Sequence, residues 1–383
     1  MKRLLIVLLV LTLALVLSAC AGGPAGGPDS SSNDTGDTGA STNAGPQLAA
    51  QLSVYNWDDY IDEGVLAAYE EQYGVELIYD TYASNEDLLA KLQAGATGYD
   101  VIFPSDYMVN QMLELGLLAE INTSDLSNWS NINPAFHNPP FDPNNGHCIP
   151  YQWGTTGITY RAGDPYFEEN TPDSWRYLFD PAVLEQYSGR GVNALNDQRE
   201  LMGAALAYLG YSVNETDRAH LEEARDIILQ AKPYWKTFNS EDYDDSLLIP
   251  DEVVLSHSWS GDAANAYWST YDDATEDGNW YYAIPQEGGV RWVDNVCITA
   301  SSERYATALH FLNYLLEPEV SAAITNFTYY ASPNDAAKAF IEADILNDPG
   351  IYPSQAVFDK LEWLRDVGDA IFIYDEMWTA IKG

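Results

Sequence analysis

Acidic and aromatic side chains recur directly after the strands that the sequence predicts. The segments that carry them are residues 55–60, 104–107, 196–200, 258–262 and 292–294. An aromatic face attracts an alkylammonium group by about 0.5–2 kcal/mol, depending on desolvation. A carboxylate accepts charge-assisted hydrogen bonds from N⁺–H groups. Together they suit a long, apolar, multiply charged amine, although with 11 Trp and 27 Tyr residues such segments also arise by chance.

The elements that must position these segments alternate along the chain. Short strands are predicted at residues 52–56, 75–79 and 100–103. Helices are predicted at residues 63–73, 85–92, 108–115, 201–209, 220–231, 304–316 and 318–325. This alternation is typical of an α/β body with a largely parallel sheet. Because ligands bind beyond the carboxyl ends of parallel strands, the segments after the strands are the candidate site.

Length and charge limit the classes of partner. The chain has 383 residues, 46% of them hydrophobic, which is enough for a large core divided into two lobes. Its formal net charge of −41 argues against nucleic acids and anionic membrane surfaces as partners. A solvated or salt-tolerant surface explains most of this charge without any ligand. A cationic ligand is compatible with it.

The N-terminal residues have the pattern of an export signal. Residues 1–19 combine a basic start with an apolar run, which predicts a secretory signal peptide. Residues 17–20 resemble the bacterial lipobox, so we expect lipidation of Cys20; the alternative is an ordinary signal peptide with a chance cysteine. Residues 20–46 then form a flexible tether rich in Gly, Ser and Asp. We expect an extracytoplasmic protein that meets the membrane only through its lipid.

Two cysteines remain in the body, Cys148 and Cys297. In an exported protein they suggest one disulfide, with two buried free thiols as the alternative. Their spacing is not that of a zinc site, and the five histidines show no ligand pattern. We therefore expect no metal and no cofactor.

A series of motifs makes the chain recognisable. Residues 52–60 read LSVYNWDDY, residues 82–86 read YASNE, and residues 99–107 read YDVIFPSDY. Further segments follow at residues 139–145, 149–157, 197–200, 209–212, 285–289 and 330–334. In this order they closely resemble the spermidine/putrescine-binding proteins of bacterial ABC importers. The matches span residues 52–368, nearly the whole body.

The resemblance implies a type II periplasmic-binding-protein fold, an α/β fold of two lobes joined by hinge strands around an interlobe cleft. Lobe 1 would comprise residues 47–153 and 294–338, and lobe 2 residues 154–293 and 339–383. The chain would cross between lobes near Gly154, Asp294 and Asn334. Cys148 and Cys297 would then lie on neighbouring strands, which favours their disulfide.

Aromatic contacts can be carried over by position. Trp57 and Tyr60 match the first aromatic wall, and Tyr107 and Trp259 match rings that stack along the polyamine. Two more aromatic contacts are matched by Trp292 and Tyr330. Without the resemblance, Trp57 is compatible with ordinary core packing. Its place directly after a predicted strand favours a position in the cleft.

The polar contacts carry over in the same way. Ser105 matches a hydroxyl near an amine terminus, and Asp294 matches a carboxylate for an amine. Asp197 and Glu200 match the pair that holds a terminal ammonium. The alternative for this pair is an interaction with the helix dipole or with Arg199.

The sequence leaves the length of the ligand open. Asp59 and Asp262 match acidic positions of the putrescine branch. Asp58 stands where the family often has Ser or Thr, and Leu364 where the spermidine branch can place Gln. A solvated position at the rim of the site is the alternative for Asp58.

The expected function is capture of spermidine and/or putrescine by a monomer and delivery to the permease subunits of an ABC transporter. No catalytic residues are expected, because the chain lacks a nucleophile elbow, a His-Glu-x-x-His helix and a phosphate-binding glycine loop. Two alternatives remain open. One is the same fold with another solute, such as a sugar or a different organic cation. The other is a secreted glycosidase that uses paired carboxylates.

Overall fold

The computed structural model describes residues 47–95 and 98–383. The expected signal peptide at residues 1–19, the lipidation site at Cys20 and the tether at residues 20–46 lie outside the described residues. Within the described body, no helix combines the length and the apolarity that crossing a bilayer requires.

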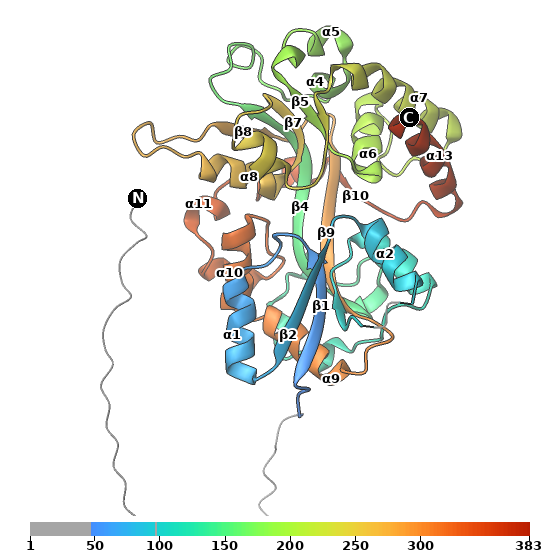
Figure 1. The fold of residues 1–383 in the computed structure, drawn as a ribbon, viewed down its shortest axis with the longest axis vertical. Helices are drawn as coiled ribbons and strands as arrows, with labels where there is room; N and C mark the ends of the chain where they lie inside the picture. Colours follow the sequence, from blue (N-terminus) through green and yellow to red (C-terminus); the bar gives the residue numbers. More distant parts are fainter. Residues whose placement is uncertain (1–46, 96–97) are drawn as a thin grey trace, which may run out of the picture. The chain divides into compact units, whose positions relative to one another are not determined.

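Ten strands form one connected sheet (Figure 1). They are β1 Gln51–Trp57, β2 Glu76–Tyr82, β3 Val101–Ile102, β4 Cys148–Arg161, β5 Val192–Ala194, β6 Thr237–Phe238, β7 Leu255–Trp259, β8 Trp280–Ala283, β9 Gly289–Ile298 and β10 Leu361–Trp363. The main path runs β2-β1-β3-β9-β4-β7-β5-β6, with β10 paired to β9 and β8 paired to β4.

Helices lie between these strands. They are α1 Glu63–Tyr73, α2 Asn85–Gln93, α3 Asp106–Glu114, α4 Arg176–Phe179, α5 Pro181–Leu184, α6 Gln198–Leu209, α7 Arg218–Ala231, α8 Ser260–Ser269, α9 Tyr305–Leu315, α10 Pro318–Thr328, α11 Ala343–Leu346, α12 Gln355–Phe358 and α13 Ile371–Lys382. Local signals set several of their ends. Ser84 caps α2 by accepting from the Asp87 N–H, and Gly74 ends α1 in the left-handed conformation that glycine tolerates best.

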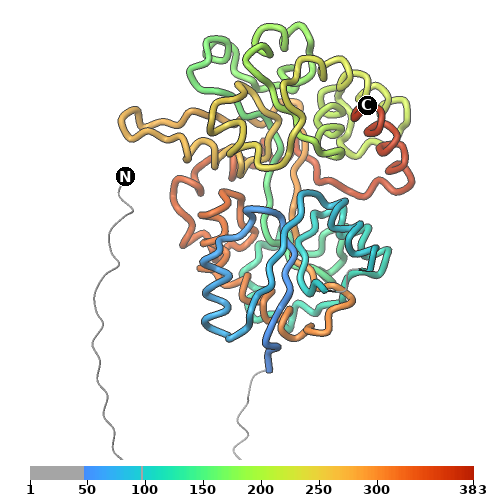
Figure 2. Tube along the Cα trace, viewed as in Figure 1, coloured from blue at the N-terminus to red at the C-terminus, as the bar shows by residue number. Residues whose placement is uncertain are grey.

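The long strands β4 and β9 connect the two halves of the sheet. They run side by side, the green and orange segments of Figure 2, although they are far apart in sequence. Residues 148–155 of β4 pair with β9, and from Thr156 onward the same strand pairs with β7. The strand therefore changes partner next to Gly154, where the resemblance places a crossing between lobes.

The expectation of a largely parallel sheet is only partly correct. β1 is parallel to β2 and β3, and β5 is parallel to β6 and β7. β4 is antiparallel to β7, β8 and β9, and β9 is antiparallel to β3. The sheet is mixed because β4 and β9 pass between its halves in opposite directions, a feature that local periodicity does not reveal.

A disulfide joins the two long strands. Cys148 and Cys297 are directly opposite residues in the β4–β9 register, with Cα atoms 4.4 Å apart. Asp142 accepts hydrogen bonds from the backbone N–H groups of His147 and Cys148. These bonds fix the chain that enters β4.

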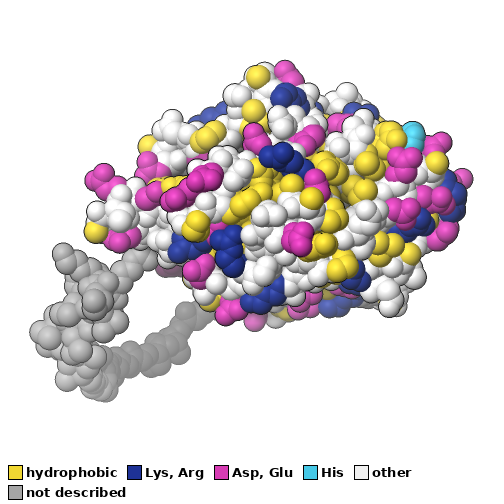
Figure 3. Space-filling model, turned by 90° about the horizontal axis from the view of Figure 1, so that it is seen from above, with side chains coloured by type: hydrophobic (Ala, Val, Ile, Leu, Met, Phe, Trp, Pro, Cys, Tyr) yellow, Lys and Arg dark blue, Asp and Glu magenta, His cyan; other side chains and the backbone are white. Residues whose placement is uncertain are grey.

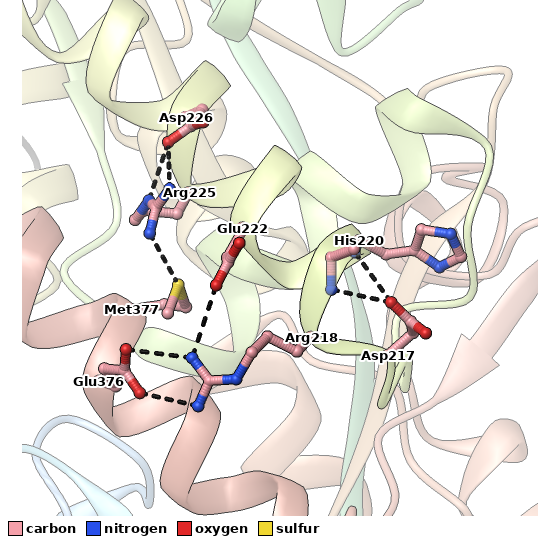
Figure 4. A network of polar contacts seen from close by, with 9 residues as sticks. Asp217, Arg218, His220, Glu222, Arg225, Asp226, Glu376 and Met377 are labelled. Carbon is pink, nitrogen blue, oxygen red and sulfur yellow. Dashed lines mark hydrogen bonds and ion pairs between the residues drawn. The ribbon is translucent and has the colours of Figure 1, made fainter.

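The C-terminal helix α13 packs on α7 and α6, and ion pairs border this packing. In Figure 4, Arg218 on α7 lies between Glu222 of its own helix and Glu376 on α13. On the face shown in Figure 3, Asp and Glu side chains are interspersed with Lys and Arg and form no single acidic patch. On this face the charged side chains are therefore arranged as on an ordinary solvated surface.

Candidate functional site

Asp294 on β9 is the best-supported carboxylate of the candidate site. It is only 6% exposed, and it accepts hydrogen bonds from the Ser105 hydroxyl (2.6 Å) and the Tyr60 hydroxyl (2.7 Å). Ser105 immediately precedes α3, and Tyr60 lies between β1 and α1. Burial raises the pKa of Asp294 to about 6, and the bonds from Ser105 and Tyr60 limit that rise. Three predicted site residues thus meet at one group.

A second carboxylate, Asp262 on α8, connects to the first through aromatic rings. The Tyr330 hydroxyl donates to Asp262 at 2.7 Å. The Tyr330 ring lies 5.4 Å from Tyr60 and 5.1 Å from Trp292, centroid to centroid and edge to face. Burial, followed by the charge of Asp244, raises the pKa of Asp262 to about 8. The two carboxylates are therefore connected through the Tyr60 and Tyr330 rings.

Two glycines allow these rings to approach the backbone. A Cβ atom on Gly154 would lie 2.5 Å from the Trp292 ring, and one on Gly261 would lie 2.5 Å from the Tyr330 ring. Gly154 belongs to β4, and Gly261 lies in the first turn of α8. Any larger residue at either position would displace the ring.

A third group of acids surrounds the N-terminus of α6. Asp197 caps this helix by accepting a hydrogen bond from the Glu200 N–H at 3.0 Å. The alternative from the sequence, an interaction with the start of the helix, therefore describes part of the role of Asp197. Glu200 is 4% exposed, and its Oε2 atom has no hydrogen-bond partner in the described protein. The buried Thr156 hydroxyl also lacks a partner. Burial, followed by the charge of Asp197, raises the pKa of Glu200 to about 8.

Asn85, which was not among the predicted site residues, links Ser105 of the first group to Tyr107. Its Nδ2 atom donates to the Ser105 hydroxyl at 3.0 Å and to the Tyr107 hydroxyl at 3.2 Å. Tyr107 in turn donates to the Glu86 carboxylate at 3.1 Å. The available sequence signal was the position of Asn85 and Glu86 directly after the helix cap Ser84.

Other predicted residues take different positions. The Trp57 indole donates to the Phe103 carbonyl at 2.9 Å and packs on Tyr82, so its N–H group is already used. Asp58 and Asp59 are exposed. Partial burial and then the charges of Asp58, Asp242 and Asp245 raise the pKa of Asp59. Within the described residues, neither Asp58 nor Asp59 is joined to Asp294 by a hydrogen bond.

Trp259, at the end of β7, lies between two of the acid groups. Its backbone N–H donates to the Tyr243 hydroxyl at 2.9 Å. The Trp259 side chain is one of the groups that lower the pKa of Glu200, which places its indole beside that carboxyl group. Tyr243 likewise lowers the pKa of Asp262. Trp259 thus lies near both Glu200 and the surroundings of Asp262.

Within the described residues, the acids of the site form no ion pair. None of the ion pairs found in residues 47–95 and 98–383 includes Asp197, Glu200, Asp262 or Asp294. Buried carboxyl groups without a counter-ion are costly to ionise. Bringing a cation among them is the chemistry that this arrangement favours.

Residues 64–353 match the family model described as bacterial extracellular solute-binding protein. The chain belongs to this family. Members of it carry solutes and do not convert them, so the solute-binding protein described here is not an enzyme.

Individual relatives are similar over almost their full length. The chain is 36% identical to the putrescine/cadaverine-binding protein of Pseudomonas aeruginosa, over 87% of this chain and 94% of that protein. It is 35% identical to the spermidine/putrescine-binding periplasmic protein of Escherichia coli, over 86% and 91% of the two chains. The solved spermidine/putrescine ABC transporter substrate-binding protein of Streptococcus pneumoniae superposes with a TM-score of 0.71 at 30% identity, covering 87% and 99%.

These comparisons confirm the resemblance and the fold class. The solute-binding protein has the mixed α/β, two-lobed type II periplasmic-binding-protein fold, and it is extracytoplasmic. The roles of individual residues in ligand binding, the limits of the two lobes and the lipid anchor stay predictions.

Proposed function

We propose that this solute-binding protein captures a polyamine, spermidine and/or putrescine, in its interlobe cleft and delivers it to the permease subunits of an ABC transporter. The observation that carries the proposal is the connection of Asp294 to Asp262 through the Tyr60 and Tyr330 rings. The carboxylates supply anionic acceptors, and the rings supply faces for the methylene chain between two ammonium groups. The names of the relatives support the same ligand class.

The two-lobed fold supports a capture mechanism. In the proposal, lobe 1 comprises residues 47–153 and 294–338 and lobe 2 comprises residues 154–293 and 339–383, and bending of β4 and β9 closes them on the ligand. Tyr330 would belong to lobe 1 and Asp262 to lobe 2, so their hydrogen bond would form only on closure. The ligand would thereby favour the closed form.

The remaining parts of the proposal concern the N-terminus and assembly. The lipobox-like residues 17–20 support lipidation of Cys20, and the tether at residues 20–46 would then hold the body near the membrane. The lipid anchor would keep the monomeric protein close to its permease.

Isothermal titration of the purified full chain tests the ligand. Micromolar binding of putrescine or spermidine corresponds to about −8 kcal/mol, and we expect it to persist at 0.5 M salt because the carboxylates are buried. Loss of binding at that salt concentration would instead indicate diffuse attraction to the acidic surface.

Thermal-shift measurements separate the alternatives. A melting temperature that rises with polyamines and not with oligosaccharides supports the proposal, because a ligand that binds only the native state stabilises it. A rise with an oligosaccharide alone would overturn the polyamine assignment.

A further inference from the structure

The pairing of β4 with β9 is interrupted at Tyr151, close to Asp294. The register shifts between Pro150 and Gln152, and Gln152 lies directly opposite Asp294, so Tyr151 has no opposite residue on β9. A β-bulge of this kind re-aims the side chain of the extra residue. The irregularity therefore sets the direction of a side chain beside the candidate site.

The side chain of Tyr151 contacts Tyr60, the residue whose hydroxyl binds Asp294. Tyr151 is 7% exposed, and its ring packs edge to face on Phe103 and on Tyr60, with centroid distances of 4.8 Å and 5.6 Å. The Tyr151 hydroxyl donates to the backbone carbonyl of Tyr60 at 2.7 Å. The Tyr60 hydroxyl in turn donates to Asp294 at 2.7 Å. One tyrosine thus holds the backbone of another, whose side chain contacts the carboxylate.

Tyr60 depends on side chains for this support because it belongs to no strand or helix. It lies in the segment between β1 and α1. Within the described residues, its carbonyl accepts hydrogen bonds only from the Tyr151 hydroxyl and, at 3.5 Å, from the Gln152 amide. A buried carbonyl that loses its main donor is costly. Removal of the Tyr151 hydroxyl should therefore allow the segment that carries Tyr60 to shift.

The next residue of β4, Gln152, supports the other tyrosine of the site. Gln152 is 1% exposed, and its Oε1 atom accepts from the hydroxyl of Thr328, the last residue of α10. The Thr328 hydroxyl accepts from the Tyr330 N–H at 3.3 Å. The rings of Tyr330 and Tyr60 lie 5.4 Å apart. Two neighbouring residues of β4 therefore hold the segments of both tyrosines.

We propose that Tyr151 is a positioning residue for the polyamine site, which keeps the Tyr60 hydroxyl against Asp294 by holding the Tyr60 carbonyl. This inference rests on the proposed polyamine function. Tyr151 contributes without touching the ligand, because its hydroxyl is bonded to Tyr60 and its ring packs on Phe103 and Tyr60. Binding groups are effective only when neighbouring residues fix their geometry.

The test compares Tyr151→Phe with the control Tyr314→Phe in the full chain. Tyr314 is 4% exposed, its hydroxyl donates to the Val65 carbonyl at 2.9 Å, and none of the rings packed on it belongs to a predicted site residue. Each variant thus removes one hydroxyl from a buried tyrosine that donates to a backbone carbonyl. Isothermal titration should show putrescine and spermidine bound about three- to tenfold more weakly by Tyr151→Phe. Tyr314→Phe should stay within about twofold of the unmodified protein.

A double-variant cycle separates positioning from a merely structural role. We expect Tyr60→Phe to weaken binding of both amines, because it removes the hydroxyl that Tyr151 positions. The double variant Tyr60→Phe/Tyr151→Phe should then bind within about twofold of Tyr60→Phe alone. Independent structural effects would instead multiply, because residues that do not act through each other contribute additively in free energy. Chemical denaturation of all variants checks that each is folded under the titration conditions.

The outcomes distinguish this inference from the proposed function. If the unmodified chain binds neither amine, the proposed function fails and this inference fails with it. If the unmodified chain binds an amine and Tyr151→Phe binds it equally well, this inference alone is overturned. It is also overturned if Tyr60→Phe has no effect, or if the double variant shows the product of the two single losses.

Discussion

The Tyr330 hydroxyl, in the segment after α10, donates to the Asp262 carboxylate on α8 at 2.7 Å. This bond joins residues that the resemblance assigns to different lobes. Burial, followed by the charge of Asp244, disfavours ionisation of Asp262, and the Tyr330 bond offsets part of that cost. Under the proposed function, this pair would connect closure of the two lobes to the charge state of Asp262.

Tyr330→Phe removes this donor and keeps the ring. We expect the pKa of Asp262 to rise further and putrescine binding at pH 7 to weaken by about 0.5–1.5 kcal/mol, the net worth of one hydrogen bond. Isothermal titration measures the change. Tyr329→Phe is the matched control, because no hydrogen bond from the Tyr329 hydroxyl is found in the described protein. Equal effects of the two variants would contradict the role of Tyr330.

The charge state of the site also predicts pH dependence. Burial raises the pKa of Glu200 and Asp262 to about 8 each, above their ordinary values of 4.5 and 3.8. In the ligand-free protein the folded state therefore binds these protons more tightly than the unfolded state. The free energy of unfolding should fall as pH rises from the ordinary values through about 8.

A polyamine reverses this trend because it binds the ionised carboxylates. We expect the rise in melting temperature caused by spermidine to be larger at pH 8 than at pH 6.5, measured by differential scanning calorimetry. Burial lowers the pKa of His257 to about 3, so this residue is neutral in the folded protein at both pH values and does not affect binding of the ligand there. If spermidine raises the melting temperature by the same amount at pH 6.5 and at pH 8, the carboxyl groups are already ionised before the ligand binds.

Gly154→Ala should disturb the group of rings. Its Cβ atom would lie 2.5 Å from Trp292, so the ring must move or the strand must shift. We expect a loss of about 1–3 kcal/mol in unfolding free energy, typical of overpacking, together with weaker polyamine binding. Chemical denaturation and titration measure the two effects. Gly189→Ala is the control, because a Cβ atom there meets nothing within 4 Å.

The disulfide between Cys148 and Cys297 closes a loop with a sequence separation of 149 residues. Chain-entropy arguments assign such a loop about 4–5 kcal/mol of stabilisation. The double variant Cys148→Ser/Cys297→Ser should therefore unfold at clearly lower denaturant concentration. Reductant should lower the midpoint of the unmodified protein and leave that of the double variant unchanged. Insensitivity of the unmodified protein to reductant would argue against the bond.

Local signals in the sequence predicted much of the fold. The helix at residues 63–73 has the limits of α1, because Asp62 and Gly74 mark both its ends. The region around α6 was also well predicted, although the helix begins at Gln198 and not at Leu201, since Asp197 is its cap. Strand direction was less predictable. The antiparallel pairing of β4 with β9 depends on partners about 140 residues apart.

The candidate site was predicted less completely than the fold. Tyr60, Ser105 and Asp294 meet as hydrogen-bonded neighbours, and position in the family motifs indicated all three. Asn85 and Glu86 were not predicted as site residues because the motif that contains them indicates the start of a helix. The structure does begin α2 at Asn85. Trp57 was expected directly after a strand, but it is the last residue of β1, and its indole N–H donates to the Phe103 carbonyl, a contact that only tertiary structure creates.

The position of β9 in the chain has a consequence for how the protein assembles during export. β9 pairs with β3 and β4, so these strands cannot be joined until residues up to Ile298 are available, and β10 at Leu361–Trp363 is added later still. Contacts between such distant residues form slowly, because the long intervening loop must first be closed. The central sheet thus stays incomplete through most of synthesis, and we expect the nascent chain to lack its native β-structure during that time.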